Sequence, residues 1–308
     1  MENHTFTVES GGAGTRLDVY LIARLPKAPS RTYLQKLIRD DKVHVNGAAR
    51  KSHYKVEPGD FIEVEIARPR KLELKAENLS LNIVFEDERL IVVDKPAGMV
   101  VHPAPGNYSG TLINALLYHA KKLSYSAQGR PGIVHRLDKN TSGLLVIAKD
   151  EVSHAFLAKQ FGKRKADKRY LAVVEGVVQL DNGVVEHPIG RHPRDRKRMS
   201  VRFSESKSAL TRYKVLERFD NGTFLEIKIE TGRTHQIRVH MAYIGHPVMG
   251  DETYGSGRTR SLIGRQALHA AEISFIHPET KVPVRFSAPM PADIVKLLEK
   301  LKKASGSK

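Results

Sequence analysis

Hydrophobic residues in the first 70 positions change from helical to alternating spacing. They recur three and four positions apart over 17–21 and again over 33–38, where Ser30 is a suitable N-cap. The segment 43–47 then alternates into an Asn-Gly turn, and 56–66 contains a Pro-Gly turn followed by a second alternating strand. The pattern predicts a compact unit of two short helices and a small sheet.

The chain from Leu79 onward alternates between strand-like and helix-like patterns. Asp150 is a suitable cap for the helix predicted after it, and 169–178 is apolar enough for a buried strand. Two Asp-Asn-Gly triplets, at 181–183 and 220–222, predict hairpin turns between strands.

A further helix is predicted near residue 240. Thr234 is its predicted cap, Ile237, Met241 and Ile244 lie on one face, and Gly245 ends it. Strands joined by hairpins and interrupted by helices favour an α+β fold with a mixed, largely antiparallel sheet over a doubly wound sheet.

The stretch 67–78 is highly charged and has no clear hydrophobic period, so we expect a domain boundary there. With 308 residues the chain has room for a small domain and a large one. We predict a small domain over 1–70, a linker over 71–80 and a larger domain over 81–308.

Composition narrows the range of functions. The chain has 51 Lys and Arg against 34 Asp and Glu, a formal net charge of +17, which favours a polyanionic partner such as nucleic acid. An adaptation for solubility is the alternative. The absence of Cys excludes disulfides, thiolate nucleophiles and Cys-ligated metals. Neither a signal peptide nor an apolar run of about 20 residues is visible, so we expect a soluble cytoplasmic protein that does not bind membranes.

Common cofactor and hydrolase motifs are missing from the sequence. There is no G-x-x-x-x-G-K-[ST], G-x-G-x-x-G, H-E-x-x-H or G-x-S-x-G pattern. His235 and His240 are five positions apart, which does not suit a shared metal on one helical face. We therefore expect chemistry performed by side chains alone, without a metal or cofactor.

One carboxylate, Asp138, lies among cationic residues in the segment "GIVHRLDKNTSGLLVIAKD". If 133–138 is extended, alternation places Arg136 and Asp138 on the same face. Cationic neighbours keep a carboxylate ionised, which suits a nucleophile or an electrostatic stabiliser better than a proton donor. A structural salt bridge is an equally simple interpretation of these residues.

Basic residues gather in three places where they could contact phosphates. The segments 159–170 and 191–202 each hold six Lys or Arg against one Asp, and further basic residues lie on the predicted helix near residue 35. A solvated charged surface is the alternative for each. The candidate RNA-binding residues are Arg31, Lys36, Arg39, Lys163, Arg164, Lys165, Arg196, Lys197 and Arg198.

Four segments resemble, in order, the motifs of the RluA/RluD family of RNA pseudouridine synthases. They read "HRLDKNTSGLL", "DKRYLAVVEG", "ETGRTHQIRVHM" and "HPVMGDETYG". The upstream "LIVVDKPAGMVVHP" is similar to the start of the catalytic domain of that family, and the first 70 residues resemble the alpha-L (S-four type) RNA-binding domain. The resemblance implies a pseudouridine synthase catalytic domain preceded by an alpha-L domain, closest to an RluD-like enzyme.

The resemblance also implies a reaction and its residues. Such an enzyme isomerises uridine: the bond from uracil N1 to ribose breaks, the base turns, and its C5 rejoins the sugar. Asp138 matches the catalytic aspartate, acting either as a nucleophile on the sugar or by promoting a glycal intermediate. Arg238 matches the arginine that pairs with it, and Tyr170 matches the tyrosine that packs on the base. From position alone, Tyr170 could instead be a core aromatic and Arg238 a surface arginine.

The same motifs imply the rest of the site and the partner. Arg136 resembles the arginine that enters the space left by the flipped base, and His135, Arg233 and Ile237 are expected among the substrate-binding residues. The expected partner is structured RNA, namely large-subunit ribosomal RNA or its precursor particle, bound by a monomer. A noncatalytic RNA-binding factor and an RNA N-glycosylase are the alternatives.

Overall fold

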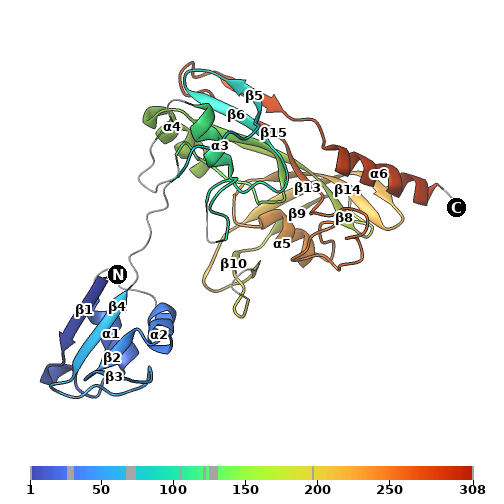
Figure 1. Cartoon of the computed structure of the whole chain (residues 1–308). Coiled ribbons are helices and arrows are strands. Elements are labelled where there is room, and N and C mark those ends of the chain that lie inside the picture. Colours follow the sequence, from blue (N-terminus) through green and yellow to red (C-terminus); the bar gives the residue numbers. More distant parts are fainter. Residues whose placement is uncertain are drawn as a thin grey trace. The chain divides into compact units, whose positions relative to one another are not determined.

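The computed structural model divides the chain into two compact units, Met1–Leu72 and Glu73–Lys308, and each is described by itself (Figure 1). The predicted limits at 70, 71–80 and 81 stay predictions. In the part of the chain that the structure describes, no helix is long and apolar enough to cross a membrane. The described residues are 2–25, 31–66, 74–103, 106–120, 123–124, 131–195 and 198–306.

The first unit is a small sheet with two helices, as its hydrophobic pattern predicts. Its strands have the order β1-β4-β2-β3, and apolar side chains such as Leu21, Leu34 and Ile62 form its core. The predicted cap Ser30 lies outside the described residues. The elements are β1 (Glu2–Thr7), the 3-10 turn Ser10–Gly12, α1 (Leu17–Arg24), α2 (Arg31–Arg39), β2 (Val43–Val45), β3 (Ala48–Ala49) and β4 (Phe61–Ile66).

The second unit is built on a nine-stranded sheet with the order β5-β6-β7-β15-β8-β14-β13-β9, and β16 pairs with β15. Among these strands β7 and β15 pair parallel and the other pairs are antiparallel, so the predicted mixed, largely antiparallel α+β fold is confirmed. The strands are β5 (Asn82–Glu86), β6 (Leu90–Lys95), β7 (Ser142–Ala148), β8 (Asp167–Glu175), β9 (Asn182–Glu186), β13 (Leu210–Phe219), β14 (Gly222–Ile229), β15 (Leu268–Ile276) and β16 (Pro283–Ser287).

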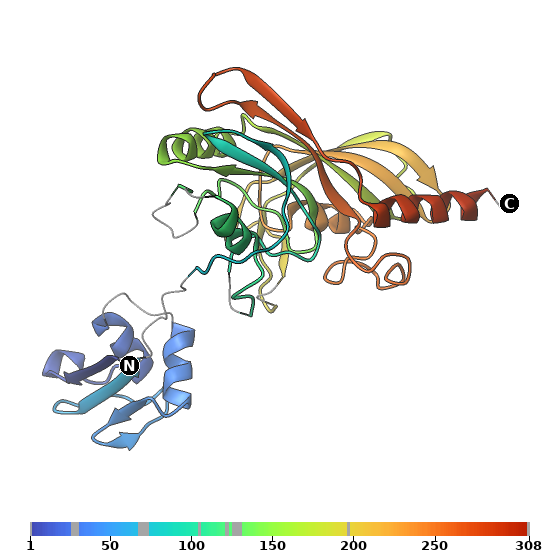
Figure 2. The same cartoon turned by 45° about the horizontal axis from the view of Figure 1, so that its top comes forward.

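Helices cover both faces of this sheet, because its central strands are apolar on both sides. Leu145 and Ile147 of β7 join the core cluster of α3, α5 and α6, whereas Leu144 and Val146 join the cluster of α4. Figure 2 shows α6 running along the sheet toward the C-terminus. The helices are α3 (Leu112–His119), α4 (Glu151–Gly162), α5 (Gln236–Tyr243) and α6 (Ala292–Ser305).

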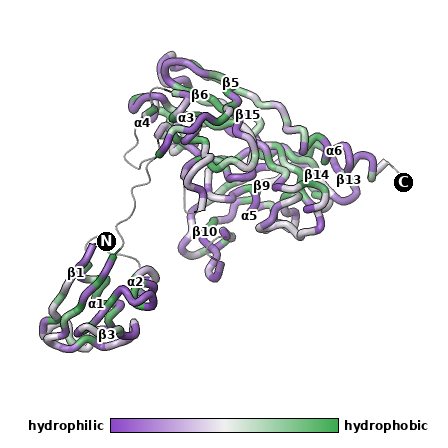
Figure 3. The backbone as a smooth tube through the Cα atoms, viewed as in Figure 1, coloured by the Kyte–Doolittle hydropathy of each residue, from purple (hydrophilic) through white to green (hydrophobic). Residues whose placement is uncertain are grey.

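A separate three-stranded sheet lies beside α5. It consists of β10 (Ile189–Arg191), β11 (Met199–Val201) and β12 (Ser206–Lys207), in the order β11-β10-β12. Ile189 packs with Val239 of α5. In Figure 3 hydrophobic stretches follow the central strands of the large sheet.

Of the two hairpin turns predicted from Asp-Asn-Gly triplets, the structure contains one. The hairpin at 220–222 is confirmed, since it joins β13 to β14. The hairpin at 181–183 is wrong: Asn182 begins β9, which pairs with β13 and not with β8. Gly183 lies against the ring of Tyr213, where a Cβ would clash, so close packing and not a turn accounts for this glycine.

The N-terminus of α5 also differs from the prediction. Asp150 does cap α4, its Oδ1 accepting from the Ser153 N–H at 2.8 Å, but Thr234 does not cap α5. That helix begins at Gln236 after His235, which has left-handed backbone dihedrals (φ 57°) and no side-chain cap bond. A left-handed non-glycine residue stores backbone strain and is found mostly at functional sites.

Candidate active site

Backbone and side-chain contacts to β7 fix the loop that carries Asp138. Ile133 makes one isolated bridge to Ile147, and the residues from there to Asp138 belong to a loop and not to a strand. The His135 Nε2 accepts a hydrogen bond from the Val146 N–H at 2.9 Å, which ties this loop to β7.

A buried lysine that the sequence analysis did not single out fixes the other side of this loop. Lys95 at the end of β6 is fully buried, and its Nζ donates to the carbonyls of Pro96, Met99 and Lys139 at 2.7, 3.0 and 3.1 Å. Burial lowers the pKa of Lys95 to about 7. The bond to the Lys139 carbonyl anchors the residue next to Asp138. The sequence does contain a signal for this buried lysine, because Lys95 ends an apolar strand in "VVDKPAG".

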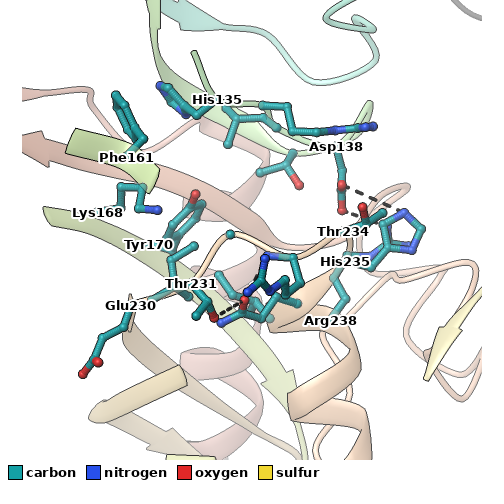
Figure 4. Close-up of a pocket in the computed structure, with 18 of the residues that line it drawn as sticks. His135, Asp138, Phe161, Lys168, Tyr170, Glu230, Thr231, Thr234, His235 and Arg238 are labelled. Atoms are coloured by element: carbon teal, nitrogen blue, oxygen red, sulfur yellow. Dashed lines mark hydrogen bonds and ion pairs between the residues drawn. The ribbon is translucent and has the colours of Figure 1, made fainter. Parts of the chain in front are cut away.

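Asp138 is bound by an arginine from α5 (Figure 4). Its Oδ2 accepts from the Arg238 Nη1 at 3.1 Å, and its side chain is 17% exposed. The two residues are 100 positions apart, and the fold brings α5 next to the loop that precedes β7. The predicted pairing of Asp138 with Arg238 is therefore present, and Arg136 lines the same pocket.

A second carboxylate completes the network around Arg238. Asp251 is fully buried and accepts two hydrogen bonds from Arg238, from Nε at 2.6 Å and from Nη2 at 2.8 Å. Its Oδ1 also accepts from the backbone N–H groups of Thr253 and Tyr254. Burial opposes both charges, but these bonds lower the pKa of Asp251 and, with the bond to Asp138, raise the pKa of Arg238.

His235 and Tyr254 form the rim of the site beside Asp138. The His235 Nε2 lies 3.9 Å from the Asp138 Oδ1, and its Nδ1 is 2.9 Å from the Tyr254 hydroxyl. That hydroxyl accepts from the Met199 N–H at 2.8 Å, which connects the β10–β11 hairpin to the site. Burial lowers the pKa of His235 despite the opposing charge of Asp138, so the imidazole is neutral at neutral pH.

Tyr170 of β8 lies in the same pocket, with 6% of its surface exposed. Burial and, to a smaller extent, the charge of Asp138 raise the pKa of Tyr170, so its hydroxyl is protonated at neutral pH. His135, at the opposite wall, stacks on Phe161 with ring centroids 4.4 Å apart. Burial lowers the pKa of His135 to about 3, in agreement with an Nε2 that accepts a backbone hydrogen bond.

The pocket between these walls has a volume of about 360 Å³. It is large enough for a nucleoside, and Figure 4 shows Tyr170 between Lys168 on one side and the Asp138 and His235 pair on the other. Among the described residues no group of three His, Cys, Asp or Glu could hold a metal ion. The structure brings all seven predicted catalytic and substrate-binding residues to this pocket: His135, Arg136, Asp138, Tyr170, Arg233, Ile237 and Arg238.

The predicted RNA-binding residues have different environments. Arg164 lines the pocket, and Lys163 and Lys165 beside it are exposed after α4. Arg198 lies over the ring of Tyr254, with the guanidinium carbon 5.4 Å from the centroid. The predicted contacts Arg196 and Lys197 lie outside the described residues.

In the first unit, all three predicted residues lie on α2, and Arg39 and Lys36 are exposed. Arg31 differs, since its Nε donates to the buried Asp18 at 3.0 Å. Asp18 also accepts from Arg16 and Gln35, and these bonds outweigh burial and lower its pKa. Arg31 is therefore oriented by the core of its own unit.

Sequence comparison assigns the class of protein that this fold and site define. The RNA pseudouridylate synthase profile matches residues 89–243, and the S4 domain profile matches residues 15–62. The chain belongs to the RNA pseudouridylate synthase family, and it is an isomerase with an N-terminal S4 domain. The resemblance found in the sequence motifs is thus confirmed.

Individual relatives span nearly the whole chain. It is 47% identical over 94% of its length to "Uncharacterized RNA pseudouridine synthase YlyB" of Bacillus subtilis, covering 94% of that protein. It is 44% identical to "Ribosomal large subunit pseudouridine synthase D" of Zymomonas mobilis, covering 98% of each. Among solved structures, "Human RNA Pseudouridylate Synthase Domain Containing 1" superposes with a TM-score of 0.59 at 28% identity, covering 79% of this chain and 98% of that one.

Proposed function

We propose that this enzyme isomerises specific uridines of large-subunit ribosomal RNA to pseudouridine, with Asp138 as the catalytic group. The observation that carries the proposal is the network in which Arg238, fixed by the buried Asp251, binds Asp138 at the mouth of a nucleoside-sized pocket. The ribosomal target is supported by relatives named "Ribosomal large subunit pseudouridine synthase D" at 39 to 45% identity.

Two routes are compatible with the carboxylate of Asp138 as the catalytic group. In the first, its carboxylate attacks the ribose C1′, the C1′–N1 bond breaks, and the electron pair leaves with uracil. In the second, Asp138 removes a sugar proton and a glycal forms as the base leaves. In both, uracil turns and its C5 bonds to C1′. In the first route the Asp138–C1′ bond breaks as this bond forms, and in the second the proton taken from the sugar is returned to it. The proton at C5 is then released and N1 gains one, so atoms and electrons balance without a cofactor.

We also propose roles for Tyr170 and for the substrate-binding residues. A protonated, buried Tyr170 suits packing against the uracil ring better than accepting a proton as a phenolate. Arg136 is exposed at the pocket entrance, where it would fill the stack that the flipped uridine leaves. His135, Arg233 and Ile237 would enclose the ribose and base and exclude water, which would otherwise intercept the cleaved sugar.

RNA affinity would come from both units. We propose phosphate contacts by Arg31, Lys36 and Arg39 in the S4 domain and by the basic residues beside α4 and in the β10–β11 hairpin. We propose that the enzyme acts on RNA as a monomer.

The test is tritium release from carbon-5-labelled uridine in large-subunit ribosomal RNA and its precursor particles. Wild type is compared with Asp138→Asn at RNA concentrations that saturate both proteins. We expect release by the wild type alone, with the RNA chain intact and the affinity of Asp138→Asn within about threefold of wild type. Release by Asp138→Asn at the wild-type rate would refute the role of Asp138. Free uracil and abasic sites would indicate an N-glycosylase instead.

A further inference from the structure

One charged residue of the pocket has no role in the proposed function so far. This residue is Lys168, two positions before Tyr170. Alternation along β8 puts Lys168, Tyr170 and Ala172 on the buried face of the strand. Lys168 is 9% exposed, and what remains accessible opens into the pocket. Figure 4 shows its nitrogen directed toward the pocket interior, on the side of Tyr170 away from Asp138.

The Lys168 ammonium lacks a polar partner in the protein. Within the described residues it makes neither a hydrogen bond nor an ion pair. Its Nζ lies 5.8 Å from the centroid of the Phe161 ring, and a Cβ added to Gly232 would lie 3.9 Å from it. The acid next to it in sequence, Asp167, is paired with Lys228 at 2.9 Å.

An unpaired buried cation is costly, so its presence calls for a ligand. Burial lowers the pKa of Lys168, and the charge of the neighbouring Asp167 opposes this shift only in part. The Lys168 ammonium thus lines a pocket that Asp138 also lines. A ligand that reaches both residues must present oxygen atoms to Lys168 while its sugar faces Asp138.

We infer that Lys168 is a catalytic residue that donates a hydrogen bond to a carbonyl oxygen of the target uracil and stabilises the negative charge of the departing base. The inference rests on the proposed function of this pocket. When the C1′–N1 bond breaks, its electron pair enters the uracil ring and is shared with O2 and O4. The ammonium keeps its proton and lends only a hydrogen bond, which strengthens as the charge develops. Bond formation between C5 and C1′ neutralises this charge; the C5 proton is then released and N1 gains one, which leaves the product ring neutral.

The position of Lys168 favours the base over a backbone phosphate. It shares a strand face with Tyr170, which packs on the base in the proposed function, and it lies between Phe161 and Gly232 on the pocket wall. Exposed cations such as Lys163 and Arg164 are better placed for phosphates, which remain hydrated on the RNA surface.

The test uses the full-length enzyme and Lys168→Met, which keeps an unbranched side chain one atom shorter but removes its charge. Lys228→Met on the neighbouring strand is the matched control, since Lys228 is a half-exposed lysine outside this pocket. Single-turnover rates are measured on RNA carrying uridine, by tritium release, and on RNA carrying 5-fluorouridine at the same position, by loss of the unmodified nucleoside. RNA affinity is measured for every protein.

We expect Lys168→Met to lower the rate on uridine by about 100-fold or more, the usual effect of removing one donor to a developing anion. RNA affinity should stay within about threefold, and Lys228→Met should react like wild type. Fluorine stabilises the uracil anion by itself, so the loss on 5-fluorouridine should be at least about tenfold smaller. A merely structural role would slow both substrates equally.

Other outcomes overturn the inference. A weaker affinity with an unchanged rate at saturation would assign Lys168 to a phosphate, and equal losses on both substrates would assign it to pocket structure. Asp138→Asn separates the two proposals: if it is inactive while Lys168→Met reacts normally, only the role of Lys168 fails. If Asp138→Asn is active, the proposed function itself fails.

Discussion

Replacing Asp251 by Asn removes the charge that holds Arg238 in place. Asp251 is fully buried, and its two oxygens accept from Arg238 at 2.6 and 2.8 Å. An amide offers one oxygen, and its NH₂ group would face an Arg238 N–H at hydrogen-bond distance. The guanidinium, 7% exposed, would keep its bond to Asp138 and at most one to the amide oxygen, without the charge of Asp251 beside it.

The cost can be worked out from this geometry. Breaking a buried ion pair by removing one partner costs about 3 to 5 kcal/mol, because the other charge stays buried without compensation. For a domain of this size each kcal/mol lowers Tm by about 2 to 4 °C, so Asp251→Asn should lower Tm by roughly 10 °C. The single-turnover rate should also fall, because Arg238 would no longer be fixed against Asp138.

Thermal unfolding and single-turnover tritium release measure the two effects. Asp181→Asn is the matched control: Asp181 also pairs with an arginine, Arg218 at 2.6 Å, but it is 78% exposed and should contribute about 1 kcal/mol or less. The double variant Asp251→Leu with Arg238→Met should recover much of the lost stability, since no unpaired charge remains. If Asp251→Asn and Asp181→Asn lower Tm equally, the buried network does not fix Arg238 as argued.

Three further predictions concern charge. Replacing Lys163, Arg164 and Lys165 by Ala should reduce the slope of log affinity against log salt by about 2, at about 0.7 per phosphate contact; an unchanged slope contradicts phosphate binding. The folded pKa of His135 lies near 3, below its unfolded value of about 6.5. Between about pH 3 and pH 6.5 the unfolded state therefore binds more protons than the folded state. The unfolding free energy should fall as the pH drops through this range, by up to about 1.4 kcal/mol per pH unit. Acid titrations of wild type and His135→Gln in urea test this, and equal slopes would refute it. Lys168→Met should raise the unfolding free energy by about 1 kcal/mol, because an unpaired desolvated cation is lost; a less stable variant would mean that the ammonium supports the fold.

Local patterns predicted those elements whose own residues determine them. The apolar run at 169–178 supplies most of β8, and Asp150 caps α4 through its own side chain. The turn predicted at 181–183 failed because the position of Gly183 depends on Tyr213, which is 30 residues away and meets it only when β9 pairs with β13. A sequence pattern read along the chain does not contain that contact.

The candidate active site, too, was predicted from the sequence only in part. The family motifs supplied Asp138, Tyr170 and Arg238, and the fold gathers them in one pocket. The structural roles of Asp251 and Lys95 were not predicted, although both lie inside matched segments, because a buried charge reads from sequence as an ordinary surface residue. Only packing distinguishes a carboxylate that binds a guanidinium from one that faces water.

The way Arg238 divides its hydrogen bonds explains how one arginine can hold Asp138 without blocking it. Two of its donors go to the buried Asp251, and a third reaches only the Asp138 Oδ2 at 3.1 Å. A bidentate pair with Asp138 would engage both carboxylate oxygens. Here the Oδ1 faces the neutral His235 at 3.9 Å across the pocket entrance. The arrangement fixes the direction of the carboxylate through one oxygen and leaves the other oriented toward the position that the proposed function assigns to the ribose.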